Sequence, residues 1–393
     1  MRILFTTWAW PSHLYSLVPL AWACRAAGHE VLIASQPGIL DETVRTGLPA
    51  AAVGHDVDAA ALVRGYLLPS TAVPAPVVPA GPEGKGPRAM RMFYAHADSM
   101  VDDLTELARD WHADLVVYEP TALAGPIAAA AAGIPAVRHL YGTDLLVRAR
   151  AMLPAVLAPL AERNGAAAFD PFGAVTIDPC PDGFQLPVDY PRLPVRYVPF
   201  NGPGAAPAPP LAPPAPGRSR VVVTWGHTLA KLSTAHFFAP QAAAALTGPD
   251  TEVVLAVSAA QQPLLTDLPD DIKTVVDVPL NLLLPGADLV VSHGGAGTVL
   301  TALHAGLPLL LVPQLPDHAG HSARVLAVGA GEVLSRDEAT PGQLREDARR
   351  LLDSGAPGRA ARLLRERMFE RPTPADLVTE LEALAERSPA AAR

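Results

Sequence analysis

Residues 2–35 read RILFTTWAWPSHLYSLVPLAWACRAAGHEVLIAS, and this stretch decides the fold. The segments 2–7 and 30–35 are short apolar runs, as expected of strands buried in a parallel sheet. Between them, a loop over 8–13 leads into a helical pattern over 14–27, which a glycine ends. A strand, a helix and a second strand in this order form the repeating unit of a parallel α/β sheet.

The same unit recurs along the chain. Residues 113–118 and 135–139 predict two further strands, with a helical pattern over 121–132 between them. After residue 217 more apolar strands follow, and then three terminal helices. These strands are 220–225, 252–257, 273–277, 288–292 and 308–312, and the helices are 341–353, 357–369 and 374–387. We therefore predict two Rossmann-like parallel-sheet α/β domains that face a central cleft.

A proline-rich segment separates the two halves. Residues 199–217 contain eight prolines, and such a chain is stiff and extended. We expect an N-terminal domain over 1–198, a linker over 199–217, a second domain over 218–372 and a C-terminal segment over 373–393. A second stretch rich in proline and glycine, residues 74–88, excludes a helix or a central strand and predicts a surface loop.

The composition limits the class of protein. Half of the 393 residues are hydrophobic and 18% are charged, which excludes a disordered chain. There are 30 basic and 39 acidic residues and no basic run, so a nucleic-acid partner is not expected. No apolar run reaches the ~18–20 residues of a membrane span. Cys24 and Cys180 are too few for a disulfide framework, and we expect a cytoplasmic protein.

The strongest chemical signal is SHGGAGT at 292–298, between a predicted strand and a predicted helix. Glycines let the backbone approach a ligand, and the free N–H groups of a helix N-terminus attract anions. We therefore predict a phosphate site to which His293 adds a donor; the alternative is a tight turn without a ligand. Leu300 stands where a dinucleotide fingerprint needs its third glycine, and no Gly-Lys-Ser/Thr of a P-loop occurs.

Two polar residues follow strands at the carboxyl edge of the first predicted sheet, where ligands of such sheets bind. His13 is a candidate general base, because imidazole accepts a proton near neutral pH. Alternatively, it caps the following helix. Glu119 is a candidate partner that fixes the tautomer of His13. Alternatively, it is a surface acid in front of Pro120.

The segment 313–321 follows the strand 308–312, so it should lie on the same edge as the glycine turn. Its Asp317 accepts hydrogen bonds and suits sugar hydroxyl groups, and His318 stands next to it. His318 and His321 have the spacing of metal ligands, but two histidines do not complete a site. We therefore predict no metal.

Aromatic side chains gather near the predicted loops of the first domain, although only 5% of the chain is aromatic. They are candidates for an apolar acceptor pocket, and packing in the core or in loops is the alternative. These residues are Trp8, Trp10, Tyr66, Phe93, Tyr94 and Tyr141.

Short matching stretches are spread over nearly the whole chain. They are PLAWA (19–23), GHEVLIA (28–34), DPCP (178–181), RYVPFNG (196–202), LTDLPD (265–270) and VPLNL (278–282), besides His13 and the glycine turn. Together they resemble the GT-B inverting glycosyltransferases of the GT1-like group. The resemblance is strongest to the actinobacterial branch that attaches deoxysugars to polyketides and macrolides.

The resemblance implies that the first domain binds the acceptor and the second the nucleotide-sugar donor. It implies that His13 is the general base, with Glu119 at the position of the usual Asp partner. His318 replaces a common Gln, and Thr301 stands where plant members have a ribose-binding Glu. The last helix of the family crosses back onto the first domain. The implied donor-binding residues are Gly226, Thr228, Val278, His293, Gly294, Gly295, Ala296, Gly297, Thr298, Asp317 and His318.

The expected activity follows from this resemblance. It is the inverting, metal-independent transfer of a deoxysugar from a dTDP-sugar to a polyketide- or macrolide-type aglycone, with no cofactor. The alternatives are a nucleotide-sugar epimerase of the same fold and a non-catalytic helper of a partner glycosyltransferase. The resemblance leaves open the choice between TDP and UDP, O- or C-linkage, and whether the protein is a homodimer.

Overall fold

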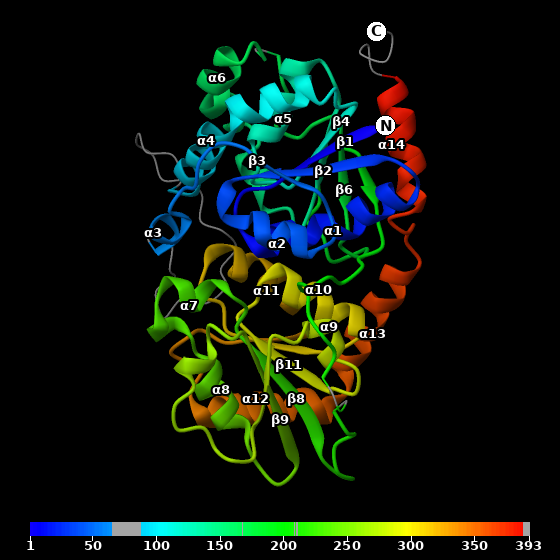
Figure 1. Cartoon of the computed structure of the whole chain (residues 1–393). Coiled ribbons are helices and arrows are strands. Elements are labelled where there is room, and N and C mark those ends of the chain that lie inside the picture. Colours follow the sequence, from blue (N-terminus) through cyan, green and yellow to red (C-terminus); the bar gives the residue numbers. More distant parts are fainter. Residues whose placement is uncertain (65–87, 167, 208, 210, 388–393) are drawn as a thin grey trace.

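The computed structural model describes residues 1–64, 88–166, 168–207, 209 and 211–387. Each half of the described chain builds one parallel sheet flanked by helices, and the two halves are stacked on each other (Figure 1). The prediction of two parallel-sheet α/β domains is therefore confirmed.

The first sheet has seven parallel strands in the order β3–β2–β1–β4–β5–β6–β7. Their bounds are β1 (Arg2–Thr6), β2 (Glu30–Ser35), β3 (Ala50–Ala52), β4 (Leu115–Tyr118), β5 (Ala136–His139), β6 (Val175–Asp178) and β7 (Arg192–Pro194). At its centre, Phe5 of β1 lies opposite Ile33 of β2 and Val117 of β4. The central strand β4 (LVVY) and the middle of β1 (ILF) are apolar because both faces of the sheet are buried there.

The helices of the first half pack on the two faces of this sheet or on one another. They are α1 (Pro11–Ala26), α2 (Leu40–Arg45), α3 (Ala59–Arg64), α4 (Arg88–Asp110), α5 (Ala124–Ala132) and α6 (Leu153–Arg163). Helix α3 also contacts the second half. Leu4 of β1 joins the core formed with α4 and α5, whereas Phe5 joins the core formed with α1. Successive residues of a strand point to opposite faces, so one strand contributes to both cores.

The second sheet has six parallel strands in the order β10–β9–β8–β11–β12–β13. Their bounds are β8 (Ser219–Thr224), β9 (Thr251–Val257), β10 (Lys273–Val276), β11 (Leu289–Ser292), β12 (Leu309–Leu311) and β13 (Gly331–Val333). The helices are α7 (Thr228–Leu232), α8 (Ala239–Leu246), α9 (Leu280–Leu283), α10 (Ala296–Ala305), α11 (Pro316–Ala327), α12 (Pro341–Ser354), α13 (Ala356–Phe369) and α14 (Asp376–Glu386).

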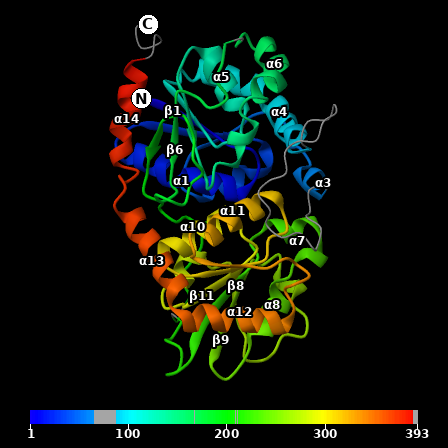
Figure 2. The ribbon, with the colours of Figure 1, turned by 180° about the vertical axis from the view of Figure 1, so that it is seen from behind.

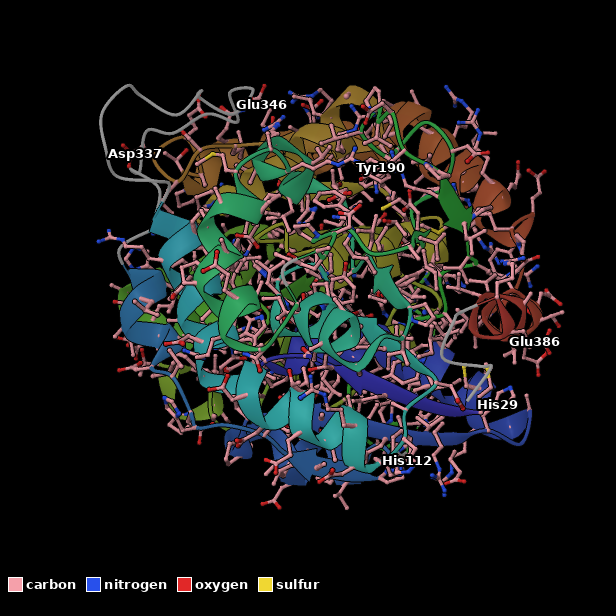
Figure 3. The ribbon with its side chains drawn as sticks, turned by 90° about the horizontal axis from the view of Figure 1, so that it is seen from above. His29, His112, Tyr190, Asp337, Glu346 and Glu386 are labelled. Atoms are coloured by element: carbon pink, nitrogen blue, oxygen red, sulfur yellow. The ribbon has the colours of Figure 1, made fainter. Side chains whose placement is uncertain are left out.

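The last helix, α14, leaves the second half and packs on the first (Figure 2). Leu377 and Leu381 of α14 are buried in the same core as Leu14 and Leu17 of α1. At the edge of this contact, His29 Nε2 lies 3.1 Å from Glu382 Oε1. Seen from above, His29 lies beside the helix that carries Glu386 (Figure 3).

Between β7 and β8 the described residues form neither helix nor strand. This connecting segment touches both halves. Phe200 packs its ring against Tyr15 and Trp22 of α1, at centroid distances of 5.3 and 4.9 Å. Asn201 donates a hydrogen bond of 3.0 Å to Thr301 on α10. Two adjacent residues of the connecting segment therefore bind it to both halves of the chain.

Two local predictions are wrong. Helix α1 begins at Pro11, so His13 lies in the first helical turn and not in a loop. Proline fits this position because its fixed φ is helical and its missing N–H has no partner there anyway. The 23-residue α4 begins at Arg88, the last residue of the predicted proline-rich loop, and the rest of that loop lies outside the described residues.

Among the described residues, no helix has the length and apolar character needed to cross a membrane.

Candidate active site

A cleft of about 840 Å³ lies between the two sheets and is lined by both halves of the chain. It opens at the carboxyl ends of the strands, where ligands of parallel sheets bind. Most of the predicted site residues line it. They are Trp8, Trp10, His13, Phe93 and Tyr141 from the first half, and Gly226, Thr228, Val278, His293, Gly295, Ala296, Gly297, Thr298, Asp317 and His318 from the second.

His13 lines the first-half wall of the cleft, and Glu119 lies behind it, not among the described residues that line the cleft. His13 Nδ1 lies 3.1 Å from Glu119 Oε2, and the side chains are 16% and 0% exposed. Glu119 directly follows β4, and its burial excludes the alternative of a surface acid. The Glu119 carboxylate contacts Nδ1 of the His13 ring. The other ring nitrogen, Nε2, has no hydrogen-bond partner among the described residues.

Sequence reasoning missed Thr121, which lines the cleft beside this pair. Its hydroxyl donates to Glu119 at 2.8 Å from Oε2 and lies 3.2 Å from His13 Nδ1. The indole N–H of Trp8 donates to the same hydroxyl over 2.8 Å. The only signal in the sequence was the position of Thr121 three residues after a strand end, which many non-functional residues share.

The predicted aromatic residues differ in their surroundings. Trp8 and Trp10 stack at 5.2 Å, and Tyr141 lies 4.6 Å from the His13 ring. Burial, with a contribution from Glu119, raises the pKa of the Tyr141 hydroxyl well above its usual value, so it stays protonated. Tyr94 packs against the core of the first half and is not among the described residues that line the cleft. Tyr66 lies outside the described residues.

Trp10 also closes the cleft on one side. Its indole N–H donates a 3.2 Å hydrogen bond to Thr228 in the first turn of α7. Lys231, one turn later, lies over the Trp10 ring at 5.5 Å. These contacts join the two halves next to the predicted acceptor side of the cleft.

The glycine turn builds the opposite wall. α10 begins at Ala296, residues 295–298 line the cleft, and Gly294 adopts a left-handed φ of 86°. Gly294 itself is not among the described residues that line the cleft; a Cβ there would come within 2.4 Å of Ser322 Oγ. The turn thus requires glycine for its own packing, and the predicted anion-binding groups are those of the helix N-terminus.

His293 is enclosed by two glycines. A Cβ on Gly295 would lie 2.5 Å from His293 Nε2, and one on Gly226 would lie 2.8 Å from His293 Cε1. His293 Nδ1 lies 3.0 Å from the hydroxyl of Ser292. Burial, together with neighbouring histidines, holds the pKa of His293 well below its usual value. The ring is therefore neutral near pH 7 and offers a hydrogen bond rather than a positive charge.

Asp317 and His318 lie in the first turn of α11, next to this wall. The carboxylate of Asp317 is 49% exposed and lies 3.8 Å from His318 Nε2. The His318 ring contacts His293 edge-on at 4.6 Å. Burial lowers the pKa of His318, and it lowers that of His321 to about 4, so both are neutral near pH 7. Asp317 exposes its carboxylate on this wall of the cleft.

Val278 and Thr301, two positions that the resemblance singled out, are fixed by neighbouring hydrogen bonds. Val278 follows Asp277, which adopts a left-handed φ of 53° and accepts a 3.0 Å hydrogen bond from the backbone N–H of Ala259. Thr301 is buried, and its hydroxyl bonds to the carbonyl of Gly297 at 2.7 Å and to the Tyr197 hydroxyl at 3.0 Å. The Thr301 hydroxyl is thus engaged in hydrogen bonds within the protein.

The part of the chain that the structure describes contains no cluster of three His, Cys, Asp or Glu side chains arranged to hold a metal ion.

Comparisons with known proteins cover almost the whole chain. The family described as "Erythromycin biosynthesis protein CIII-like, N-terminal domain" matches residues 22–226, and its C-terminal domain matches residues 241–384. The chain is 36% identical to 10-deoxymethynolide desosaminyltransferase from Streptomyces venezuelae, over 100% of both chains. It is 37% identical to aklavinone 7-beta-L-rhodosaminyltransferase from Streptomyces galilaeus, over 98% of this chain and 96% of the relative.

Solved structures give the same picture. The glycosyltransferase VinC in complex with dTDP is 33% identical, has a TM-score of 0.81, and the match covers 99% of this chain and 100% of that one. The spinosyn rhamnosyltransferase SpnG with spinosyn aglycone is 30% identical, with a TM-score of 0.80 and coverage of 97% and 100%.

Proposed function

The chain belongs to the erythromycin biosynthesis protein CIII-like family and is a glycosyltransferase. We propose that it transfers a deoxysugar from a dTDP-sugar to a polyketide- or macrolide-type aglycone, with inversion at the anomeric carbon. The observation that carries the proposal is the opposition of two walls across one cleft. One wall holds His13 against Glu119, and the other holds the N-terminus of α10.

The substrate class rests on the relatives and on the lining of the cleft. The relatives' names specify a desosaminyl transfer with 10-deoxymethynolide and a rhodosaminyl transfer with aklavinone, and VinC is solved with dTDP. On the His13 side the lining includes Trp8, Trp10, Phe93 and Tyr141, which suits an apolar acceptor. Asp317 faces the same cleft and suits hydroxyl or amino groups of the transferred sugar.

The proposed chemistry starts at His13. Its Nε2 takes the proton of the acceptor hydroxyl while the acceptor oxygen bonds to the anomeric carbon. The bond from that carbon to the diphosphate oxygen breaks on the opposite face, and dTDP leaves. Glu119 holds the ring and stabilises the imidazolium. A positioned base contributes ~10²–10⁴-fold to such a step.

The leaving diphosphate gains negative charge as its bond to carbon breaks. The N–H groups at the start of α10, the Thr298 hydroxyl and the neutral imidazole of His293 donate hydrogen bonds to it in the proposed mechanism. Such donors need no protonation change, so the stabilisation operates across the neutral pH range. Residues from both walls exclude water, which would otherwise hydrolyse the donor.

The experiment combines a substrate screen with one variant. The wild-type protein is incubated with dTDP- and UDP-sugars and with a panel of aglycones that includes 10-deoxymethynolide and aklavinone. Products are identified by mass spectrometry, and the anomeric configuration by NMR. We expect an inverted glycoside from a dTDP-sugar, and no donor conversion without an acceptor. His13→Ala should bind dTDP like the wild type and lose turnover; an unchanged turnover would refute the proposed mechanism.

A further inference from the structure

The Glu119 carboxylate is held by more than His13. The backbone N–H of Thr121 donates to Glu119 Oε2 over 2.8 Å, and the Thr121 hydroxyl lies 2.8 Å from Oε2 and 2.9 Å from Oε1. Glutamate has one more rotatable bond than aspartate, so its carboxylate needs additional fixing to face the His13 ring. Thr121, which is 4% exposed, supplies two donors for this purpose.

The direction of each hydrogen bond follows from the chemistry of the groups. An indole N–H only donates, so Trp8 Nε1 donates to the Thr121 hydroxyl oxygen. An ionised carboxylate only accepts, so the single proton of the Thr121 hydroxyl goes to Glu119. Both neighbours of His13 Nδ1, at 3.1 and 3.2 Å, are therefore acceptors. Nδ1 must carry the proton, and Nε2 keeps its lone pair.

The Trp8 ring is itself fixed from several sides. It contacts His96 at 4.2 Å, Trp10 at 5.2 Å and His13 edge-on at 5.0 Å. His96 is buried, and its Nδ1 lies 3.1 Å from Gln36 Oε1, which also accepts the backbone N–H of Ala9. The donor atom of Trp8 thus has a defined position relative to Thr121.

We infer that Thr121 and Trp8 are positioning residues for the reaction: they orient Glu119 and fix His13 in the tautomer whose Nε2 accepts the substrate proton. This inference rests on the proposed function, in which His13 is the base. Neither residue donates or accepts the substrate proton itself. Their contribution should appear in the turnover number and not in donor binding.

The test compares variants that remove or retain the Thr121 hydroxyl, together with one variant of Trp8. Thr121→Val removes the hydroxyl at nearly constant shape, and Thr121→Ser retains it. With the donor–acceptor pair from the screen, we expect Thr121→Val to lower kcat by roughly 10- to 100-fold, as for loss of a hydrogen bond to a charged group. KM for the donor and Kd for dTDP should not change. Thr121→Ser should restore kcat, and Trp8→Phe should lower kcat by less than Thr121→Val.

A matched control separates this role from simple loss of a buried hydroxyl. Thr105 on α4 is 2% exposed and its hydroxyl has no partner among the described residues, so Thr105→Val should keep kcat. NMR of ¹⁵N-histidine-labelled protein reports the tautomer of His13 directly. We expect a protonated Nδ1 in the wild type and in Thr121→Ser, and a mixture of tautomers in Thr121→Val.

The failure of this inference is distinguishable from failure of the proposed function. If the screen yields no glycoside, the proposed function is wrong; if His13→Ala keeps full turnover, the proposed mechanism is wrong. If His13→Ala is inactive but Thr121→Val keeps its kcat and its His13 tautomer, only the role of Thr121 is wrong. Adding Thr121→Val to His13→Ala should not lower the residual rate further, because both changes act through one group. An additive loss would overturn the inference, and an unchanged kcat in Trp8→Phe would overturn the role of Trp8.

Discussion

Gly226 gives the sharpest test of the donor side of the cleft. It follows β8, adopts a left-handed φ of 57° and lies directly against His293. In Gly226→Ala, the new methyl carbon would lie 2.8 Å from His293 Cε1 and 3.0 Å from Nε2. Contacts this short are not tolerated, so the imidazole has to move away from the position that faces the glycine turn.

The magnitude has two parts. An alanine in the left-handed region costs ~1–2 kcal/mol, and overpacking against a buried ring costs ~1–3 kcal/mol. The expected loss in the free energy of unfolding is therefore ~2–5 kcal/mol. If the displaced His293 no longer donates to a charged phosphate, ~1.5–3 kcal/mol of binding energy is lost, which is ~10- to 100-fold in Kd for dTDP.

The control is Gly217→Ala. Gly217 also has a left-handed φ, of 83°, but a Cβ there would meet no atom within 4 Å. It should lose only the ~1–2 kcal/mol of the backbone cost and bind dTDP normally. Kd is measured by isothermal titration calorimetry with dTDP, and stability by denaturant unfolding. If Gly226→Ala binds dTDP as tightly as Gly217→Ala, then His293 does not contact the diphosphate and the reasoning fails.

Three further predictions concern buried groups. Burial lowers the pKa of three histidines to about 4 in the folded state, whereas in the unfolded chain their pKa is the usual ~6.5. At a pH below ~6.5 the unfolded state therefore binds more protons than the folded state. Stability should be highest above that pH and fall toward pH 4, and a flat denaturation profile between pH 7 and 5 would contradict this. These histidines are His96, His139 and His321. Arg138 and its partner Asp144 are both 0% exposed, so Arg138→Met should lose ~3–5 kcal/mol of unfolding free energy. Arg163 is 44% exposed in its ion pair, so Arg163→Ala should lose under ~1 kcal/mol. Equal losses of the two variants in urea titrations would refute this distinction between buried and exposed pairs. Burial raises the pKa of the Cys24 thiol to about 12 and that of the Cys180 thiol well above its usual value. Neither thiol should therefore react with a disulfide reagent at pH 8 until the chain is unfolded. Rapid labelling of the native protein would contradict this prediction and show that the cores around the two thiols open.

The sequence by itself determined most of the long strands and their order, whereas the strands β3, β6, β7 and β13, of three or four residues each, were not predicted. Buried parallel strands are apolar runs, and helices end at glycines such as Gly133 and Gly306, whose left-handed φ values of 73° and 74° favour this residue. The glycine turn was also recognisable, because a strand, a glycine-rich turn and a helix N-terminus are contiguous in the chain. These signals come from residues that are neighbours in the chain, so they can be recognised in the sequence alone. The start of α1 was missed because Trp10 lacks a capping side chain.

Only the tertiary structure decided which side chains share an environment. Thr121, 108 residues from His13, contacts its ring only because β1 and β4 are adjacent in the sheet, and Trp10 reaches Thr228 only because the two halves are stacked. Burial decided protonation in the same way: His293 and His318 are neutral because the fold removes them from water, and no neighbour in the sequence indicates that. Through-space distance and dielectric environment are properties of the packed chain, and a linear pattern does not contain them.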